Sequence, residues 1–132
     1  MPKTAENLDT AYRSLKSLLV EFEAPGSSRT LKGRSASELD FDLWSVPDAA
    51  AEERSSKEVF FAGIRRQKTF VGFYYFPIYS VPSLAASLAP SLVRLLKGKS
   101  CFHIRSLDGD LLDQIRRALQ VGLEDFQKRG WV

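Results

Sequence analysis

The sequence predicts one α+β domain over residues 1–132, in which a twisted, mostly antiparallel sheet of four to five strands is packed by N-terminal and C-terminal helices. Two observations predict this fold. Apolar residues recur at helical spacing near both ends of the chain, and short β-rich runs fill its middle. A short helical crossover is expected before the last strand. A chain of 132 residues most simply forms one domain with one core.

The first element is a helix, expected over residues 7–22. Its apolar residues are spaced three and four apart and form one stripe, made of Leu8, Ala11, Tyr12, Leu15, Leu18, Leu19 and Phe22. Pro25 and Gly26 supply the break that ends the helix. One side of this helix is therefore expected to pack against the sheet.

Two strands are expected next, a weak one over residues 28–33 and a half-buried one over residues 38–44. Strict alternation in the second strand puts Leu39, Phe41 and Leu43 on one face and Asp40, Asp42 and Trp44 on the other. Residues 47–57 are polar and mixed in charge, which indicates a mobile loop.

A β-hairpin is expected from the runs 58–64 and 69–79, which the basic segment Arg65-Arg66-Gln67-Lys68 connects. Both runs are apolar on both faces, which is typical of strands central to a covered sheet. Burying an unpaired guanidinium is costly, so the first strand is expected to end at the arginines. The hairpin would then have a basic tip.

The C-terminal part predicts a helical crossover, a strand and a long helix. Pro82 begins one helical turn, Pro90 fits the first position of a second helix, and Gly98 fits the end of that helix. A strand over residues 100–105 and a helix over about 108–129 follow. The long helix starts with Asp108, Asp110 and Asp113, and its buried stripe is Leu112, Ile115, Leu119, Leu123 and Phe126.

The direction of the last strand stays open, because a connection of about twenty residues permits either pairing with the aromatic strand. A parallel strand would bring Lys99 beside the basic hairpin tip. An antiparallel strand would bring Lys99 near Tyr79 instead.

Residues 59–107 contain no Asp or Glu, although they hold seven Lys and Arg and nine aromatic residues. This acid-free stretch is either a surface for an anionic, partly apolar ligand or a hydrophobic β-core with basic turns. The net charge is only +3 and no helix-turn-helix, zinc-finger or RNP pattern occurs, which disfavours nucleic-acid binding. A single cysteine fits a reducing cytoplasm, and no apolar run approaches the ~18 residues of a membrane span.

Patterns for catalysis or metal binding are sparse. Cys101 and His103 face the same side of one strand and could form a thiolate pair, but no orienting carboxylate lies nearby in sequence. With one His and one Cys, the chain lacks the usual ligands of zinc or iron. Residues 96–100 look like a phosphate loop, yet the expected order of helix, Gly and strand is wrong for one. No catalytic residue, metal or cofactor is expected.

Two segments resemble the YdhG-like domains of unknown function, namely FFAGIRRQKTFVGFYYFPIY at residues 60–79 and LAPSLVRLLKGKSCFHI at residues 88–104. The likeness covers about residues 57–129, and the first helix and strands match more loosely. The string Gly-Lys-Ser-Cys-Phe with the preceding Pro-Ile-Tyr is fairly specific for one branch. The resemblance implies a small α+β domain with an antiparallel-rich sheet. Some relatives are described as iron chaperones with a frataxin-like role, and members often have His where this chain has Tyr74.

The favoured function is a cytoplasmic, non-enzymatic binding domain with an aromatic and basic groove. The groove would take a small anionic or amphipathic ligand or a partner segment, and the alternative is that the rings only fill the core. Its expected lining is Tyr75, Tyr79, Lys68, Lys99, Arg65 and His103. The other functions considered are a frataxin-like iron chaperone and an enzyme using Cys101 and His103. The partner is an unidentified small molecule or protein, no membrane partner is expected, and a homodimer is left open.

Overall fold

The structure is a computed structural model that describes residues 4–25, 29–47, 57–80, 84, 86 and 88–131, and the statements below concern those residues. The helices are α1 (Thr4–Glu21), α2 (Phe76–Ser80), α3 (Pro90–Val93) and α4 (Gly109–Lys128). The strands are β1 (Ala24–Pro25), β2 (Arg29–Arg34), β3 (Asp40–Pro47), β4 (Val59–Arg66), β5 (Val71–Tyr75), β6 (Leu96–Lys97) and β7 (Cys101–Ile104).

All seven strands form one antiparallel sheet in the order β1-β2-β3-β4-β5-β7-β6. The α+β fold predicted from the sequence is confirmed, with slightly more strands than expected. The five longer strands lie where strands were predicted, and the additional β1 and β6 are two residues each. Within the described residues, no helix combines the length and apolar character that crossing a membrane requires.

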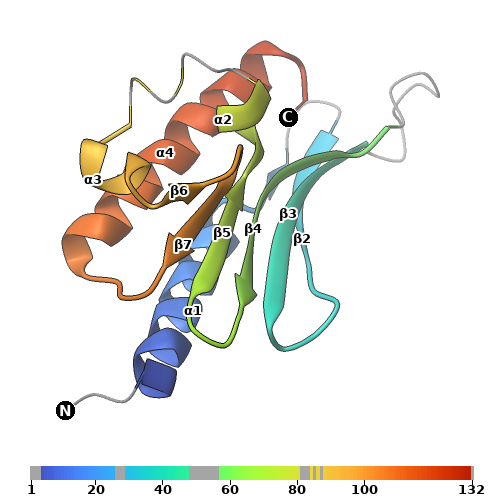
Figure 1. Ribbon diagram of the computed structural model, residues 1–132. Helices are drawn as coiled ribbons and strands as arrows, with labels where there is room; N and C mark the ends of the chain where they lie inside the picture. The colour runs from blue at the N-terminus through green and yellow to red at the C-terminus, as the bar shows by residue number, and fades with distance from the viewer. Residues whose placement is uncertain are drawn as a thin grey trace.

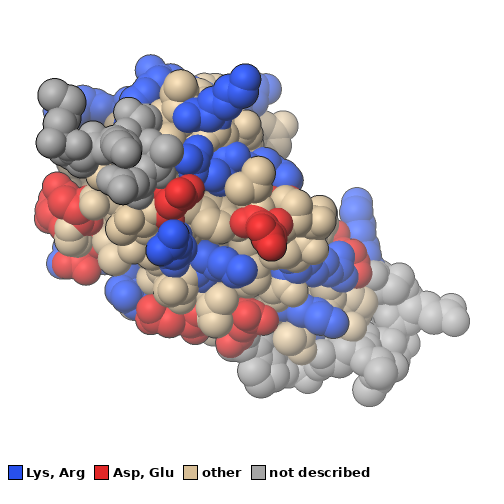
Figure 2. Space-filling view, turned by 90° about the horizontal axis from the view of Figure 1, so that it is seen from below, with Lys and Arg blue, Asp and Glu red and all other residues tan. Residues whose placement is uncertain are grey.

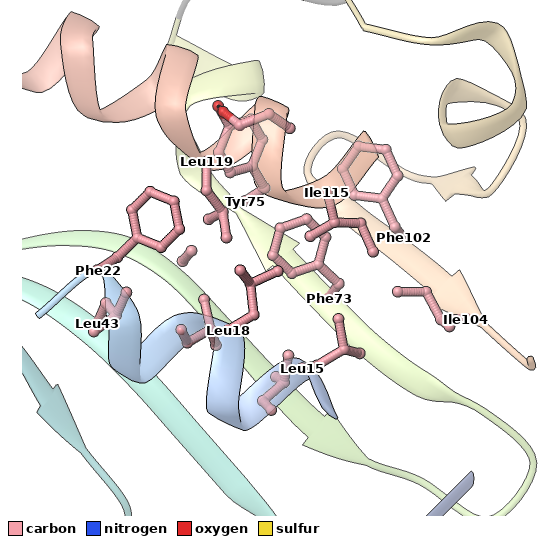
Figure 3. Packing of buried hydrophobic residues seen from close by; sticks show 14 of the residues in the cluster. Leu15, Leu18, Phe22, Leu43, Phe73, Tyr75, Phe102, Ile104, Ile115 and Leu119 are labelled. Carbon is pink, nitrogen blue, oxygen red and sulfur yellow. Dashed lines mark hydrogen bonds between the residues drawn. The ribbon is translucent and has the colours of Figure 1, made fainter. Parts of the chain in front are cut away.

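The two long helices lie on the same side of the sheet (Figure 1). Their adjacent turns are joined by an ion pair in which Arg116 Nη1 lies 2.6 Å from Glu21 Oε1. The predicted stripe of α1 is buried along its whole length, from Leu8 to Phe22. Alternation along β5 turns Val71 and Phe73 toward these helices, so the core fills the space between the helices and the sheet (Figure 3).

Tyr75 fixes α4 against the sheet. Its side chain is 0% exposed, and its hydroxyl donates a hydrogen bond to the Ala118 carbonyl oxygen in α4. The Gly122 amide donates to the same hydroxyl oxygen, and burial raises the pKa of Tyr75 far above its usual range. Gly122 is required for this approach, because a Cβ there would lie 2.4 Å from the hydroxyl oxygen. One tyrosine thus sets the spacing between β5 and the middle of α4.

A bulge explains why the run 58–64 is apolar on both faces. The register between β3 and β4 shifts between Leu43 and Trp44, so Phe61 has no partner in β3. Phe61 and Ala62 are both fully buried, and the Phe61 ring packs edge-on against Phe126 of α4 at 4.9 Å between centroids. The described helices lie against one face of the sheet, and the side chains of β4 and β5 on the other face are half-buried or exposed, apart from the glycines.

The aromatic strand is shorter than predicted. Residues 69–79 were expected to form one β-rich run in which Pro77 ends the ladder or lies at an edge, but β5 already ends at Tyr75 and the chain turns directly into α2. Tyr79 therefore lies on a helical turn and not on a strand face. Because β7 pairs antiparallel with β5, Lys99 comes close to Tyr79, with its Nζ 5.6 Å from the ring centroid. The antiparallel alternative for the last strand is the correct one.

The strand before the basic hairpin tip ends at the arginines, as expected, because β4 ends at Arg66. Both guanidinium groups have acidic partners, since Asp42 lies 3.6 Å from Arg65 and Asp9 lies 3.1 Å from Arg66. The expectation for Gly98 needs correction. Gly98 does not end a helix, since α3 ends at Val93. Its φ of 80° instead serves the turn between β6 and β7. Most of the predicted loop 47–57 and most of the helical turn after Pro82 lie outside the described residues.

The close approach at Gly122 has a testable consequence. Gly122→Ala is expected to lower the free energy of unfolding by about 1–3 kcal/mol, because the new methyl group would overlap the Tyr75 hydroxyl. Helix propensity alone predicts the opposite, a gain of about 1 kcal/mol. Urea denaturation followed by circular dichroism measures the sign.

Gly109→Ala is the matched control in the same helix. A Cβ at Gly109 would meet no atom within 4 Å. This substitution is therefore expected to be neutral or slightly stabilising. If the two alanine variants changed stability equally, the contact between Tyr75 and Gly122 would not control the packing of α4.

Candidate functional site

The six residues predicted to line a groove do not come together in one place. Tyr75 is part of the core, where no ligand at the surface can reach it. Tyr79 is 53% exposed, and Lys99 covers its ring at one end of the sheet. Lys68 lies in the turn between β4 and β5, beside Gln67. Only Arg65 and His103 share one surface, the face of the sheet that the described helices leave uncovered.

We call this surface the outer face, meaning the sheet face that carries Asp42, Tyr74 and His103. The strand register places Arg65, Gly72 and His103 next to one another on β4, β5 and β7. The residues of the outer face are half-buried or exposed, apart from the glycines. Tyr74 lies on this face, while its neighbour Tyr75 points into the core, and Tyr74 was not among the residues predicted to line a groove.

A polar cluster occupies the centre of the outer face. One Arg65 guanidinium nitrogen lies 3.6 Å from Asp42 Oδ2, and the guanidinium carbon lies 5.6 Å from the centroid of the Tyr74 ring. The other Asp42 oxygen is buried and has no hydrogen-bond partner among the described residues. It rests directly on Gly63, where a Cβ would be only 2.0 Å away. Loss of water around the carboxylate raises the pKa of Asp42, although Arg65 opposes the shift.

Cys101 belongs to this cluster but is a poor nucleophile. The Tyr74 hydroxyl donates a hydrogen bond to the Cys101 sulfur, which favours the thiolate. Burial outweighs that bond, so the pKa of Cys101 is raised above its usual value. His103 is held by a different contact, a stack on the Phe70 ring with 3.9 Å between centroids and 15° between planes. The two side chains thus have different neighbours, Tyr74 for Cys101 and Phe70 for His103.

His103 lies on the outer face and also lines a pocket of about 300 Å³ at the edge of the sheet. We call it the edge pocket, and its lining is Ser91, Leu95, His103, Arg105, Ser106, Asp108, Asp110, Leu111 and Gln114. It lies where the pairing of β6 with β7 ends, and the His103 amide there donates to the Leu95 carbonyl just before β6 begins. In Figure 1 the chain leaves the lower end of β7 and turns back into the start of α4.

Hydrogen bonds hold the helical wall of the edge pocket. Asp108 Oδ1 accepts from the Leu111 amide at 2.8 Å and so caps the start of α4. Asp110 Oδ2 accepts from Gln114 Nε2 at 2.7 Å, and Gln114 Oε1 accepts from the Ser91 hydroxyl at 2.8 Å. The position of these polar groups is therefore set by α3 and α4.

The strand wall of the edge pocket carries positive charge. Arg105 follows β7 directly and is exposed. None of the ion pairs within 4.0 Å in the described part of the chain involves Arg105. Its guanidinium can therefore donate to a bound anion without first breaking a salt bridge.

The acid-free stretch is partly neutralised by acids from outside it. Two of its four arginines have such partners, Asp42 for Arg65 and Asp9 for Arg66. Figure 2, which views the molecule from below, shows Lys and Arg interspersed with Asp and Glu. The residues that the structure describes also contain no group of three or more His, Cys, Asp or Glu side chains that could hold a metal ion.

Comparisons of the chain with protein-family models, with curated proteins and with solved structures return no match. Membership of the YdhG-like family therefore stays a prediction from the two segments that resemble it.

The buried carboxylate of Asp42 predicts an unusual pH dependence. A carboxyl group whose folded pKa is raised destabilises the fold when ionised, and this cost disappears as the pH falls through the folded pKa toward the unfolded value of 3.8. Asp42→Asn is therefore expected to raise the free energy of unfolding at neutral pH and to lose this advantage in acid. Urea denaturation of wild type and variant at neutral and mildly acidic pH measures the difference.

Asp40 provides the control on the same strand. Hydrogen bonds from the Ala36 amide and the Ser37 hydroxyl lower the pKa of Asp40. Its stabilising effect is present above the unfolded pKa and is lost as the pH falls through the folded pKa. Asp40→Asn is therefore expected to destabilise the protein at neutral pH, opposite in sign to Asp42→Asn. If both variants changed the free energy of unfolding in the same direction, burial would not be the dominant effect on the pKa of Asp42.

The raised pKa of Cys101 predicts slow alkylation. Iodoacetamide is expected to react with Cys101 in the folded protein more slowly than in urea-unfolded protein, because the thiolate is the reacting form. Tyr74→Phe removes the hydrogen bond that favours the thiolate and is expected to slow the reaction further. Mass spectrometry of timed samples measures both rates. A folded protein that reacts faster than the unfolded chain would restore Cys101 as a candidate nucleophile.

Proposed function

We propose that the protein is a small-molecule-binding domain, without enzymatic activity, whose edge pocket holds an anionic group of its ligand. The observation that carries the proposal is the position of Arg105, a guanidinium without an ion pair in the described structure, beside His103 in a pocket. The location in the cytoplasm, inferred from the single cysteine, is part of the proposal.

The edge pocket has the mixed character of a ligand site. Leu95 and Leu111 offer apolar contact, while the remaining lining residues offer hydrogen-bond donors and acceptors. The stack on Phe70 holds the His103 ring in one orientation, so less side-chain entropy is lost when a ligand binds. The pocket volume of about 300 Å³ suits a small metabolite.

The edge pocket fits this role better than the aromatic groove expected from sequence. A groove along the aromatic strand would need Tyr75 at the surface, and Tyr75 is buried against α4. The Tyr79 ring is exposed, but Lys99 already covers it. His103 is the one predicted residue that the edge pocket contains.

The two other candidate functions receive less support from the described residues. Iron binding would need clustered oxygen or nitrogen ligands, and no such group of three occurs there. An enzyme using Cys101 would need a thiolate, and burial raises the pKa of that thiol.

Titration with butyrate tests the proposal, because butyrate combines a carboxylate with a short apolar tail. Changes in amide chemical shift in two-dimensional NMR are expected at His103, Ser106 and Leu111, the lining of the edge pocket. Arg105→Ala is expected to weaken binding by about tenfold or more, as for a lost hydrogen bond to a charged group.

Arg94→Ala is the matched control, since Arg94 is an exposed arginine of the same acid-free stretch that does not line the edge pocket. It is expected to leave butyrate affinity unchanged. Shift changes spread over the whole surface, or equal losses from the two arginine variants, would contradict a site at Arg105.

A further inference from the structure

The two walls of the edge pocket carry opposite charges. His103 and Arg105 come from the strand wall, and Asp108 and Asp110 come from the start of α4. The chain passes from one wall to the other within a few residues, across a short connection. The pocket is therefore polarised, with donors on the strand side and carboxylates on the helical side.

The carboxylates keep free binding capacity. Each of the two hydrogen bonds described above engages one oxygen, Oδ1 of Asp108 and Oδ2 of Asp110. The second oxygen of each carboxylate accepts no hydrogen bond within the described part of the chain. A carboxylate can accept about four hydrogen bonds, so both groups can still bind an ammonium ion.

The opposite charges do not neutralise each other directly. Arg105 shares the pocket with Asp108 and Asp110, yet none of its nitrogens lies within 4.0 Å of a carboxylate oxygen in the described structure. Each carboxylate is instead held toward α4, by the Leu111 amide and by Gln114. A molecule with a positive and a negative end can bridge this separation.

We infer that the edge pocket takes a zwitterionic small molecule of the amino-acid class. Its carboxylate would contact Arg105 and His103, and its ammonium group would contact Asp110 and Asp108. The carbon chain between them would lie against Leu95 and Leu111. This inference rests on the proposed function, to which it adds the class of ligand.

A set of matched probes tests the inference on the wild-type protein. Glycine, β-alanine and γ-aminobutyrate differ in the spacing of their charges. Butyrate lacks the ammonium group of γ-aminobutyrate, and butylammonium lacks its carboxylate. In NMR titrations, the best-fitting amino acid is expected to bind about tenfold or more tightly than its carboxylate and ammonium analogues, as for one added charge-assisted contact.

Asp110→Asn tests whether Asp110 contacts the ammonium group of the ligand. The amide oxygen can still accept the bond from Gln114, but the negative charge is gone. This variant is expected to lose the advantage of the amino acid over butyrate while keeping butyrate affinity. Asp113→Asn is the matched control, an exposed aspartate of the same helix that does not line the edge pocket. It is expected to change neither affinity.

The outcomes separate the two claims. If butyrate binds as tightly as every amino acid and Arg105→Ala weakens it, the anion site stands and the zwitterion inference is overturned. If neither the amino acids nor butyrate shift the amides of the edge pocket, both claims fail. The wild-type comparison decides between these results even if a variant does not fold.

Discussion

The hydroxyl of Tyr75 is the contact on which the rest of the structure depends. It donates to the Ala118 carbonyl and occupies the space that a Cβ at Gly122 would fill, so it holds β5 and the middle of α4 in close contact. β7 pairs directly with β5, and the start of α4 follows β7. The two walls of the edge pocket therefore belong to elements that this buried contact holds together.

One-sided packing explains much of the chain's unusual composition. The bulge at Phe61 allows two consecutive residues, Phe61 and Ala62, to enter the same core. On the outer face the rings are not stacked against a second layer of described helices. They are covered instead by cations, with Arg65 over Tyr74 and Arg34 over Trp44. The aromatic and basic residues of the outer face thus contact one another within the sheet, and these contacts do not require a ligand.

Sequence patterns predicted the elements whose signals are local and failed where a distant partner decides the outcome. The stripe from Leu8 to Phe22 predicts α1 because one face of the helix meets a broad core. The capping of α4 by Asp108 is equally local. The end of β5 at Tyr75 is local only in part, because Pro77 indicates a break while the aromatic and β-branched residues continue to Tyr79.

The same reasoning applies to the charges. The arginines were expected to end β4 because a buried guanidinium needs a partner, and β4 does end at Arg66. The partners come from Asp42 on β3 and Asp9 on α1, which local sequence does not reveal. His103 was found from sequence as one of two polar residues on a strand, whereas Arg105 was counted only as charge. Its role in the pocket depends on where α3 and α4 lie.

The C-terminal end of the acid-free stretch indicates where opposite charges meet in the structure, which the overall composition does not. Arg105 is the last basic residue within the stretch, and Asp108 is the first acid after it. Between them the chain reverses from a strand into a helix, which turns a change of charge along the sequence into opposite charges across a pocket. In this chain the basic residues of β4 are neutralised by neighbouring elements, as Asp42 and Asp9 show. The charges at the end of the stretch stay apart because Asp108 and Asp110 are engaged by groups of α4, the Leu111 amide and Gln114.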